Sequence, residues 1–346
     1  MTSLALTRTQ ILAFRRSVGA LDERLPLNAT TLRRAAWAGL QDSMPRAALL
    51  SVHARVKGIG PATWEHPALV QIWGPRWSAY IVAARDVAPF TLGRMPDDID
   101  RRRKLEDLAQ RVHVYLRGRR VPFGDLRRPL ALPHPNYVRY ATATGRFRIR
   151  WEGARQPTIW TTPAPDVDPR AARLELARRY LHVFGPSTPS SFTTWAGISA
   201  ASGDGAFASL ARSLTHVRTP LGDAWILSSD EPAIRAAPKA AAAARLLPSG
   251  DTFFLLQGRD RELLVPRADR RGSLWTSRVW PGCVLVDGEV AGTWRRAGPL
   301  VAIEPWRRLA RSERASVEEE ALALPLNEGQ IRVSWAGDQA PYRRTD

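Results

Sequence analysis

The polar tripeptide Gln41-Asp42-Ser43 stands in a short turn between two predicted helices, within the segment WAGLQDSMPRAALLSVHARV. A glutamine carbonyl can hold a water molecule, and a carboxylate can hold one more strongly while stabilising a nearby positive charge. Asp42 or Ser43, followed by Pro45 in the first helical turn, is also the residue pattern of a helix N-terminus. Two interpretations follow: the turn only caps the second helix, or it caps the helix and also contributes to a reaction.

Basic and aromatic side chains near this turn are candidates for contacts with a polyanion. Arg46, His53 and Lys57 are spaced so that they form one polar stripe on the second helix, which is either a DNA-backbone contact or an ordinary solvated face. Arg76 and Trp77 follow in a short loop. Arg76 is a further candidate contact, and Trp77 is either a wedge between bases or a buried core residue.

A second group of basic residues lies on a predicted hairpin, RFRIRWEGARQPTIW. Its alternation of apolar and basic residues and its Glu-Gly turn are typical of a two-stranded ribbon. Arg148, Arg150 and Arg155 lie on this hairpin. We expect them to contact phosphate or the minor groove of DNA.

The charge of the whole chain supports a nucleic-acid partner. The 346 residues contain 51 Lys+Arg against 33 Asp+Glu, a net charge of +18, and only three of the basic residues are lysine. Residues 101–155 alone hold 15 basic and 4 acidic residues. A GC-rich coding sequence would explain the preference for arginine but not the sign of the total, so we expect a basic face that binds nucleic acid. The alternative is a soluble protein that is merely basic.

Several classes of protein are not expected. The single cysteine, Cys283, excludes an internal disulfide, and the six scattered histidines lack the spacing of a metal site. Neither a Walker loop nor a Gly-x-Gly-x-x-Gly motif occurs, so we expect no metal, no nucleotide cofactor and no other cofactor. No run of 18 apolar residues or signal segment is visible. We therefore expect a soluble, cytoplasmic monomer without a membrane partner.

Proline-containing junctions divide the chain into blocks that repeat one pattern, helices followed by a hairpin. Such a pattern is typical of a winged helix, and its loose repetition predicts an array of similar units. The predicted fold class is α+β, with three tandem winged-helix units and a small C-terminal antiparallel β domain. The predicted boundaries are 1–95, 96–165 and 166–245 for the three units, 246–310 for the β domain, and 311–346 for a tail.

Three segments resemble the winged-helix family of bacterial alkylpurine DNA glycosylases, the AlkZ and YcaQ group. They are GLQDSMPRAALLSVHARV, RRYLHVFGPSTPSSFTTWAGI and VDGEVAGTWRR, and the resemblance extends from about Gln10 to Trp306. It implies that the three winged helices form a basic concave surface around duplex DNA. It also implies excision of alkylated bases and, in some members, the unhooking of interstrand crosslinks.

The chain departs from the family at its catalytic signature, which is a glutamine, an apolar residue, then a glutamine or an aspartate. Gln41 matches the first position, Asp42 replaces the apolar residue, and Ser43 occupies the second catalytic position. The resemblance thus assigns water positioning to Gln41, with Asp42 as a possible source of the carboxylate. A non-catalytic winged-helix protein that binds damaged, structured or regulatory DNA is the alternative function.

Overall fold

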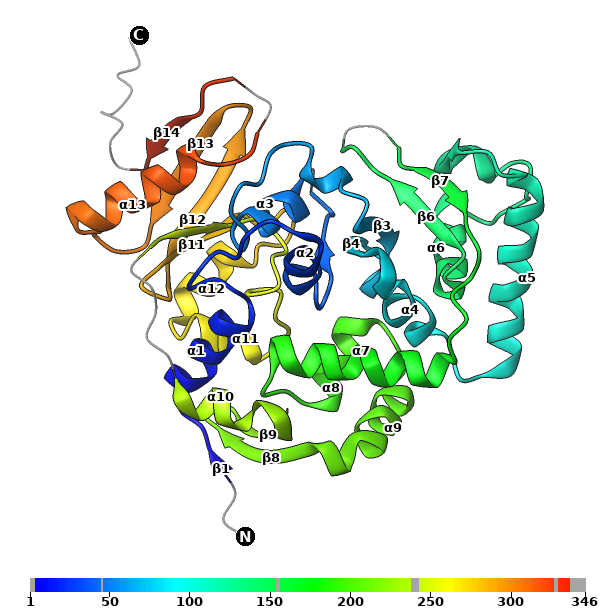
Figure 1. The fold of residues 1–346 in the computed structure, drawn as a ribbon, viewed down its shortest axis with the longest axis horizontal. Helices are drawn as coiled ribbons and strands as arrows, with labels where there is room; N and C mark the ends of the chain where they lie inside the picture. Colours follow the sequence, from blue (N-terminus) through cyan, green and yellow to red (C-terminus); the bar gives the residue numbers. More distant parts are fainter. Residues whose placement is uncertain (1–3, 45, 154–155, 238–242, 327–328, 337–346) are drawn as a thin grey trace.

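The computed structural model describes residues 4–44, 46–153, 156–237, 243–326 and 329–336. Within these ranges the chain forms helices and four small sheets, so the predicted α+β class is confirmed (Figure 1). Short 3-10 helices, labelled η, join many of these elements. The description of the three helical parts as tandem winged helices stays a prediction, as do the domain boundaries.

The first part of the chain contains the Gln41 turn. Asn28 caps its second helix, α2 (Ala29–Ala35), which begins at the next residue. The Asn28 side chain accepts a hydrogen bond from the Thr31 amide. The turn follows this helix, and its first residue pairs with the middle strand of a sheet in the order β2-β4-β3. The elements are β1 (Leu4–Ala5), α1 (Arg8–Val18), α2 (Ala29–Ala35), β2 (Leu40–Gln41), α3 (Ala47–His53), η1 (Thr63–Glu65), β3 (Leu69–Trp73), η2 (Pro75–Trp77), β4 (Ala79–Ala83), η3 (Ala84–Asp86), α4 (Val87–Phe90) and η4 (Leu92–Arg94).

The second part is built around one long helix, α5 (Ile99–Leu116), which begins at the cap residue Asp98. Its buried residues Leu108, Val112 and Leu116 recur every fourth position and pack in a core with the following sheet. That sheet has the order β5-β7-β6. The remaining elements are β5 (Val121–Pro122), η5 (Phe123–Leu126), η6 (Pro135–Tyr137), α6 (Val138–Ala141), η7 (Thr142–Thr144), β6 (Phe147–Arg150) and β7 (Thr158–Thr161).

In its described residues the third part consists of four α-helices and a hairpin. Asp168 caps the first helix ahead of Pro169, and Thr188 caps the second ahead of Pro189. The hairpin β8–β9 is extended by the N-terminal strand β1, which runs parallel to β8. The elements are α7 (Pro169–Phe184), α8 (Pro189–Ala196), α9 (Ala200–Leu210), η8 (Ala211–Ser213), β8 (Leu214–Thr219), β9 (Gly222–Leu227), η9 (Ser228–Asp230) and α10 (Glu231–Ala236).

The C-terminal part forms a sheet in the order β10-β11-β12-β13-β14. One expectation is wrong here. The edge strand β14 runs parallel to β13, so the sheet is not purely antiparallel. β14 lies within residues 311–346, and the boundary of this segment as a separate tail stays a prediction. The elements are β10 (Arg245–Leu247), α11 (Asp260–Leu264), α12 (Ala268–Leu274), β11 (Gly282–Val286), β12 (Glu289–Ala297), β13 (Leu300–Pro305), α13 (Arg311–Leu322) and β14 (Arg332–Trp335).

The apolar segment DTFFLLQG lies in a buried turn and not in a strand. Asp251 accepts a hydrogen bond from the Phe253 amide through its side chain, and its carbonyl accepts the Leu255 amide. These local bonds replace the ladder that a strand would need. Cys283 lies in β11 and is buried.

The first, third and C-terminal parts of the chain share one large core. It joins Leu12, Tyr80, Trp195, Phe254 and Leu285, which come from widely separated segments. In Figure 1 the helices α2 and α3 lie between the C-terminal sheet and the β6–β7 pair. The Gln41 turn, at the start of α3, is therefore positioned by several parts of the fold at once.

Candidate active site and nucleic-acid interface

Gln41 is held in place by hydrogen bonds at both ends of its side-chain amide. Its Oε1 accepts from the Arg76 guanidinium at 2.9 Å, and its Nε2 donates to the Ser43 hydroxyl at 3.1 Å. The backbone of Gln41 pairs with Tyr80 in β4, which fixes the start of the side chain. Gln41 and Ser43 are both half-buried. The first and third residues of the signature therefore contact each other.

Two further segments close around Gln41. Arg76 also donates to the carbonyl of Trp195 at 3.1 Å, which connects the turn to α8. On another side, the backbone of Gly250 passes so close that an added Cβ would lie 3.3 Å from Cδ of Gln41. Gly250 has a φ of +78°, a conformation that residues with a side chain rarely adopt. The Arg76–Gln41 pairing was not predicted from the sequence.

Asp42 points away from Gln41, into the protein. One carboxylate oxygen accepts from the Ala48 amide in the first turn of α3 at 3.0 Å, and the other accepts from Gln71 Nε2 at 2.7 Å. Asp42 therefore stabilises the first turn of α3, but it is not the cap residue itself, because the N-cap of α3 is Arg46, which makes no side-chain cap bond. Burial raises the pKa of Asp42 to about 7, against the opposing effect of these hydrogen bonds. With an exposed fraction of 2%, the carboxylate is out of reach of DNA in this conformation.

Gln71 is a residue of the site that sequence reasoning missed. It lies in β3, donates to Asp42, and accepts the backbone amide of Trp151 at 2.6 Å. Trp151 follows strand β6, so this amide connects the Gln41 turn to the predicted basic hairpin. A signal was available, because a lone glutamine in the apolar run LVQIW needs a buried polar partner.

A buried ion pair fixes the loop that carries Gly250. The Arg55 guanidinium makes two hydrogen bonds to the Asp251 carboxylate, at 2.6 and 2.7 Å, and a third to Thr252 Oγ1 at 3.0 Å. Both charged side chains are almost completely buried. The pair therefore ties the chain after α3 to the loop after β10, directly beside Gln41.

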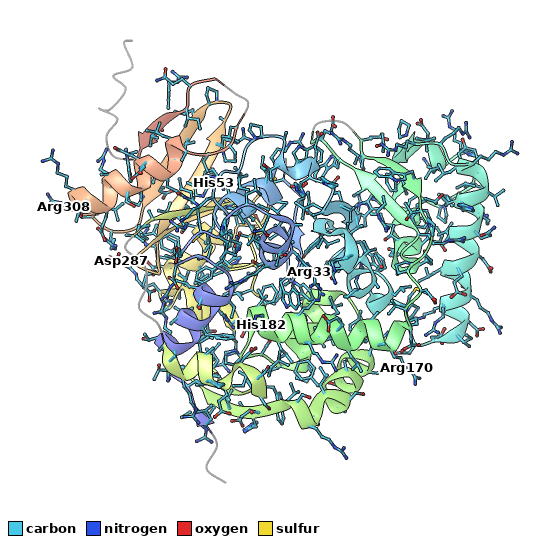
Figure 2. The ribbon with its side chains drawn as sticks, viewed as in Figure 1. Arg33, His53, Arg170, His182, Asp287 and Arg308 are labelled. Carbon is cyan, nitrogen blue, oxygen red and sulfur yellow. The ribbon has the colours of Figure 1, made fainter. Side chains whose placement is uncertain are left out.

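The predicted polar stripe on the second helix is wrong. Helix α3 ends at His53, and Lys57 lies beyond it as an exposed residue in a turn. His53 is 7% exposed and close to the charges of Arg24 and Arg245. Figure 2 shows it on the side of α3 that faces the C-terminal sheet. Burial, with these two cations, lowers the pKa of His53 to about 3. Arg46 precedes the helix and adopts a φ of 64°, so its side chain does not follow the direction that a helical residue of the expected stripe would have.

The basic residues of the predicted hairpin are partly neutralised within the protein. Arg150 forms ion pairs with Glu65 and Glu152 at 2.5 and 2.7 Å. Arg148 donates to the carbonyls of Gly145 and Phe147, and burial lowers its pKa. The Arg46 and Arg150 guanidinium groups both lie over the Trp64 ring, at 3.7 and 4.4 Å from its centroid.

The stacking of Arg46 and Arg150 on Trp64 joins the hairpin to the start of α3. A contact of these two arginines with DNA stays a proposal. Arg155 lies outside the described residues.

Trp77 is neither fully buried nor fully exposed. The Arg94 guanidinium lies 4.0 Å from its ring centroid, and Tyr140 meets the ring edge to face at 5.2 Å. Among the described residues, no three His, Cys, Asp or Glu side chains gather closely enough to hold a metal ion. Across the same ranges, every helix is too short or too polar to cross a bilayer.

A family model described as DNA glycosylase AlkZ-like matches residues 34–325, and the chain belongs to this family. It is 24% identical over 226 residues to the interstrand DNA cross-link repair glycosylase of Streptomyces sahachiroi. That match covers 56% of this chain and 60% of the relative. The solved structure of Streptomyces sahachiroi DNA glycosylase AlkZ is similar with a TM-score of 0.77 at 17% identity, covering 96% of this chain and all of the other. The fold is shared, and the predicted family is confirmed.

Proposed function

We propose that the protein hydrolyses the N-glycosidic bond of an alkylated purine in duplex DNA. The observation that carries the proposal is the Gln41 amide, oriented by Arg76 on one side and by Ser43 on the other. A polar group fixed before the reaction begins stabilises developing charge without reorganisation, which is a major source of catalytic rate.

The chemistry needs little acid catalysis because the alkylated base is already a cationic leaving group. What the enzyme must supply is a positioned water and stabilisation of an oxocarbenium-like sugar. The carbonyl of Gln41 accepts from Arg76 with one lone pair, so the second lone pair is available to hold a water. Ser43 accepts from Gln41, so its hydroxyl hydrogen can orient the same water.

Asp42 and Arg76 are positioning residues in this proposal. Asp42 fixes the backbone of the turn through Ala48 and Gln71, and Arg76 fixes the Gln41 amide. Lys57, the lysine nearest to the turn in sequence, lies 16 residues after Gln41. Because a Schiff-base route needs an amine at the sugar, we propose a monofunctional glycosylase that uses water alone.

Single-turnover base release tests the proposal, on a duplex that carries one 7-methylguanine or 3-methyladenine. We expect Gln41→Ala to lower the rate by about 10²-fold or more, the lower end of what a positioned base or water contributes, while DNA affinity is kept. Gln257→Ala, which removes a half-buried glutamine in another loop, is the matched control. Equal rates for the parent protein and Gln41→Ala would contradict the role of Gln41.

The second candidate function is that of a protein that binds damaged DNA without releasing a base from it. It is favoured by Ser43, which supplies a hydroxyl where the resemblance places a catalytic amide or carboxylate, and by the buried position of Asp42. Tight, salt-sensitive binding without release of any alkylated base would support this candidate. A duplex with an interstrand crosslink belongs in the same assay, because the relative is a cross-link repair glycosylase.

A further inference from the structure

A pocket that neither Gln41 nor Arg76 lines opens next to Trp77. Its volume is about 440 Å³, within the range of ligand sites in proteins. Its walls come from η2, the chain between η4 and α5, the first turns of α5, the end of α6 and the start of α9. Trp77, the neighbour of Arg76 in sequence, forms part of one wall.

Aromatic rings form one side of this pocket. Trp77, Tyr137 and Tyr140 all line it, and Tyr140 contacts both other rings edge to face, at 5.2 and 5.8 Å. Tyr140 is 39% exposed. Exposed aromatic rings beside a cavity are platforms on which a planar ligand stacks.

A buried cation with an unpartnered donor lies behind Trp77. Arg94 is 4% exposed, and its Nε donates to the carbonyl of Ala196. Its Nη2 has no hydrogen-bond partner in the part of the chain that the structure describes. Burial lowers the pKa of Arg94 to about 9, so the group is still charged at neutral pH. An unpaired buried donor is costly, and here the charged group lies over the Trp77 ring that lines the pocket.

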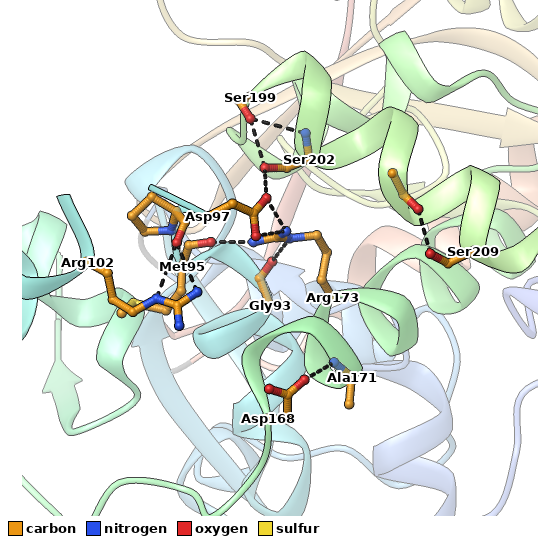
Figure 3. A network of polar contacts seen from close by, with 12 residues as sticks. Gly93, Met95, Asp97, Arg102, Asp168, Ala171, Arg173, Ser199, Ser202 and Ser209 are labelled. Carbon is orange, nitrogen blue, oxygen red and sulfur yellow. Dashed lines mark hydrogen bonds and ion pairs between the residues drawn. The ribbon is translucent and has the colours of Figure 1, made fainter. Parts of the chain in front are cut away.

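The acidic residues of the pocket are already engaged by the protein. Asp97 accepts two hydrogen bonds from Arg173 and one from Ser202, and Figure 3 shows this network at the pocket wall. Asp98 caps α5 through the amide of Arg101. Arg94, together with the side chains of Arg101 and Lys104, therefore leaves the pocket positively charged.

We propose that this pocket binds one nucleotide, with its base against Trp77 and Tyr140 and its phosphate toward Arg101 and Lys104. The chain has no glycine-rich phosphate loop, so recognition rests on stacking and on the arginine and lysine donors. Two sources have this chemistry: a nucleotide displaced from bound DNA, and a free nucleoside monophosphate. The proposal goes beyond the proposed function because it requires no reaction at Gln41.

Two probes distinguish the sources. The first is a pair of labelled duplexes, one fully paired and one with a single unpaired purine nucleotide, compared by fluorescence anisotropy. The second is AMP alone, titrated by calorimetry. We expect either about tenfold tighter binding of the bulged duplex, as one stacked base supplies, or AMP binding with a Kd below about 1 mM.

The variants Tyr140→Ala and Lys104→Glu should abolish whichever effect is seen. Both residues are exposed, so the protein is expected to fold. Arg103→Ala is the matched control, because Arg103 is exposed on α5 but does not line the pocket. It should weaken binding of both duplexes equally. The proposal is overturned if neither probe shows an effect, or if Tyr140→Ala leaves the effect unchanged.

The test is independent of glycosylase activity. Gln41→Ala should keep the preference for the bulged duplex or for AMP even where base release is lost. Loss of the preference in Tyr140→Ala, with base release absent from every form of the protein, would support the pocket and contradict only the proposed function.

Discussion

The charged residues around the Gln41 turn are paired within the protein, whereas charged residues on helix α5 are exposed to solvent. Around the turn, Asp42, Arg55 and Arg76 all have hydrogen-bonded partners within the protein. On α5, Arg103 and Lys104 are exposed and form no ion pair among the described residues. The turn is thus fixed before any partner arrives, whereas α5 keeps its charge available. We infer that the first region is suited to chemistry and the second to affinity.

Breaking the buried pair at the turn should have the largest effect. In Asp251→Asn the buried Arg55 loses its counter-charge, and we expect a loss of about 3–5 kcal/mol in the free energy of unfolding. Urea denaturation measures it. Asp107→Asn makes the same exchange on the exposed face of α5, and we expect a change within about 0.5 kcal/mol. Similar losses in the two variants would contradict the comparison.

Restoring a carboxylate at the third position of the signature sharpens the role of the turn. Ser43 contacts the Gln41 amide, so Ser43→Asp places a stronger water-binding group beside it. We expect base release to rise by about ten- to a hundredfold, within or below the effect of a positioned general base. Ser43→Ala should lower the rate instead, because it removes the hydroxyl that orients Gln41 and the water. A slower reaction in Ser43→Asp would mean that the native hydroxyl itself is required.

Removing the charge of α5 should weaken DNA binding without slowing the chemical step. The triple variant Arg101→Ala, Arg103→Ala, Lys104→Ala is expected to bind duplex DNA about tenfold more weakly. The salt dependence of log K should flatten by about 0.9 for each phosphate that the variant no longer neutralises. Anisotropy titrations at several salt concentrations measure both quantities. The control is the triple variant Arg212→Ala, Arg218→Ala, Arg235→Ala, which removes the same charge elsewhere. Equal weakening of DNA binding by this control would contradict a special role of α5.

The smallest effect concerns pH. The pKa of His53 is lowered to about 3 in the folded protein, against about 6.5 in the unfolded chain. Between these two pKa values only the unfolded state takes up the proton. The fold therefore has its full free energy of unfolding above pH 6.5, and part of it is lost as the pH falls below that value. The loss approaches about 1.4 kcal/mol per pH unit. His53→Met should remove this slope in denaturation curves at pH 5.5 and 8, and an unchanged slope would mean that His53 is protonated in the fold.

The sequence predicted local features well and pairings over long distances poorly. The short turn before α3 depends on neighbouring residues, and it was predicted. The partner of Gln41 lies 35 residues away, and Glu65, a partner of Arg150, lies 85 residues away. Neither pairing leaves a spacing that periodicity can detect.

His53 shows a further limit of prediction from spacing. The expected stripe required a regular helix through Lys57, but α3 ends at His53 and the chain then turns. All seven residues of α3 are buried, so the helix has no solvated face on which a stripe could lie. Gln71 was missed for a different reason, because its two partners come from the turn and from the chain after β6.

The Arg55–Asp251 pair also affects how the molecule opens. It joins the chain after α3 to the loop between the C-terminal sheet and α11, so these segments should unfold as one cooperative unit. Hydrogen exchange at the Ala48 amide, which Asp42 binds, should then be nearly as slow as in the most protected strands. A truncated chain that ends before β10 would lose this slow exchange, and with it the fixed geometry of Gln41.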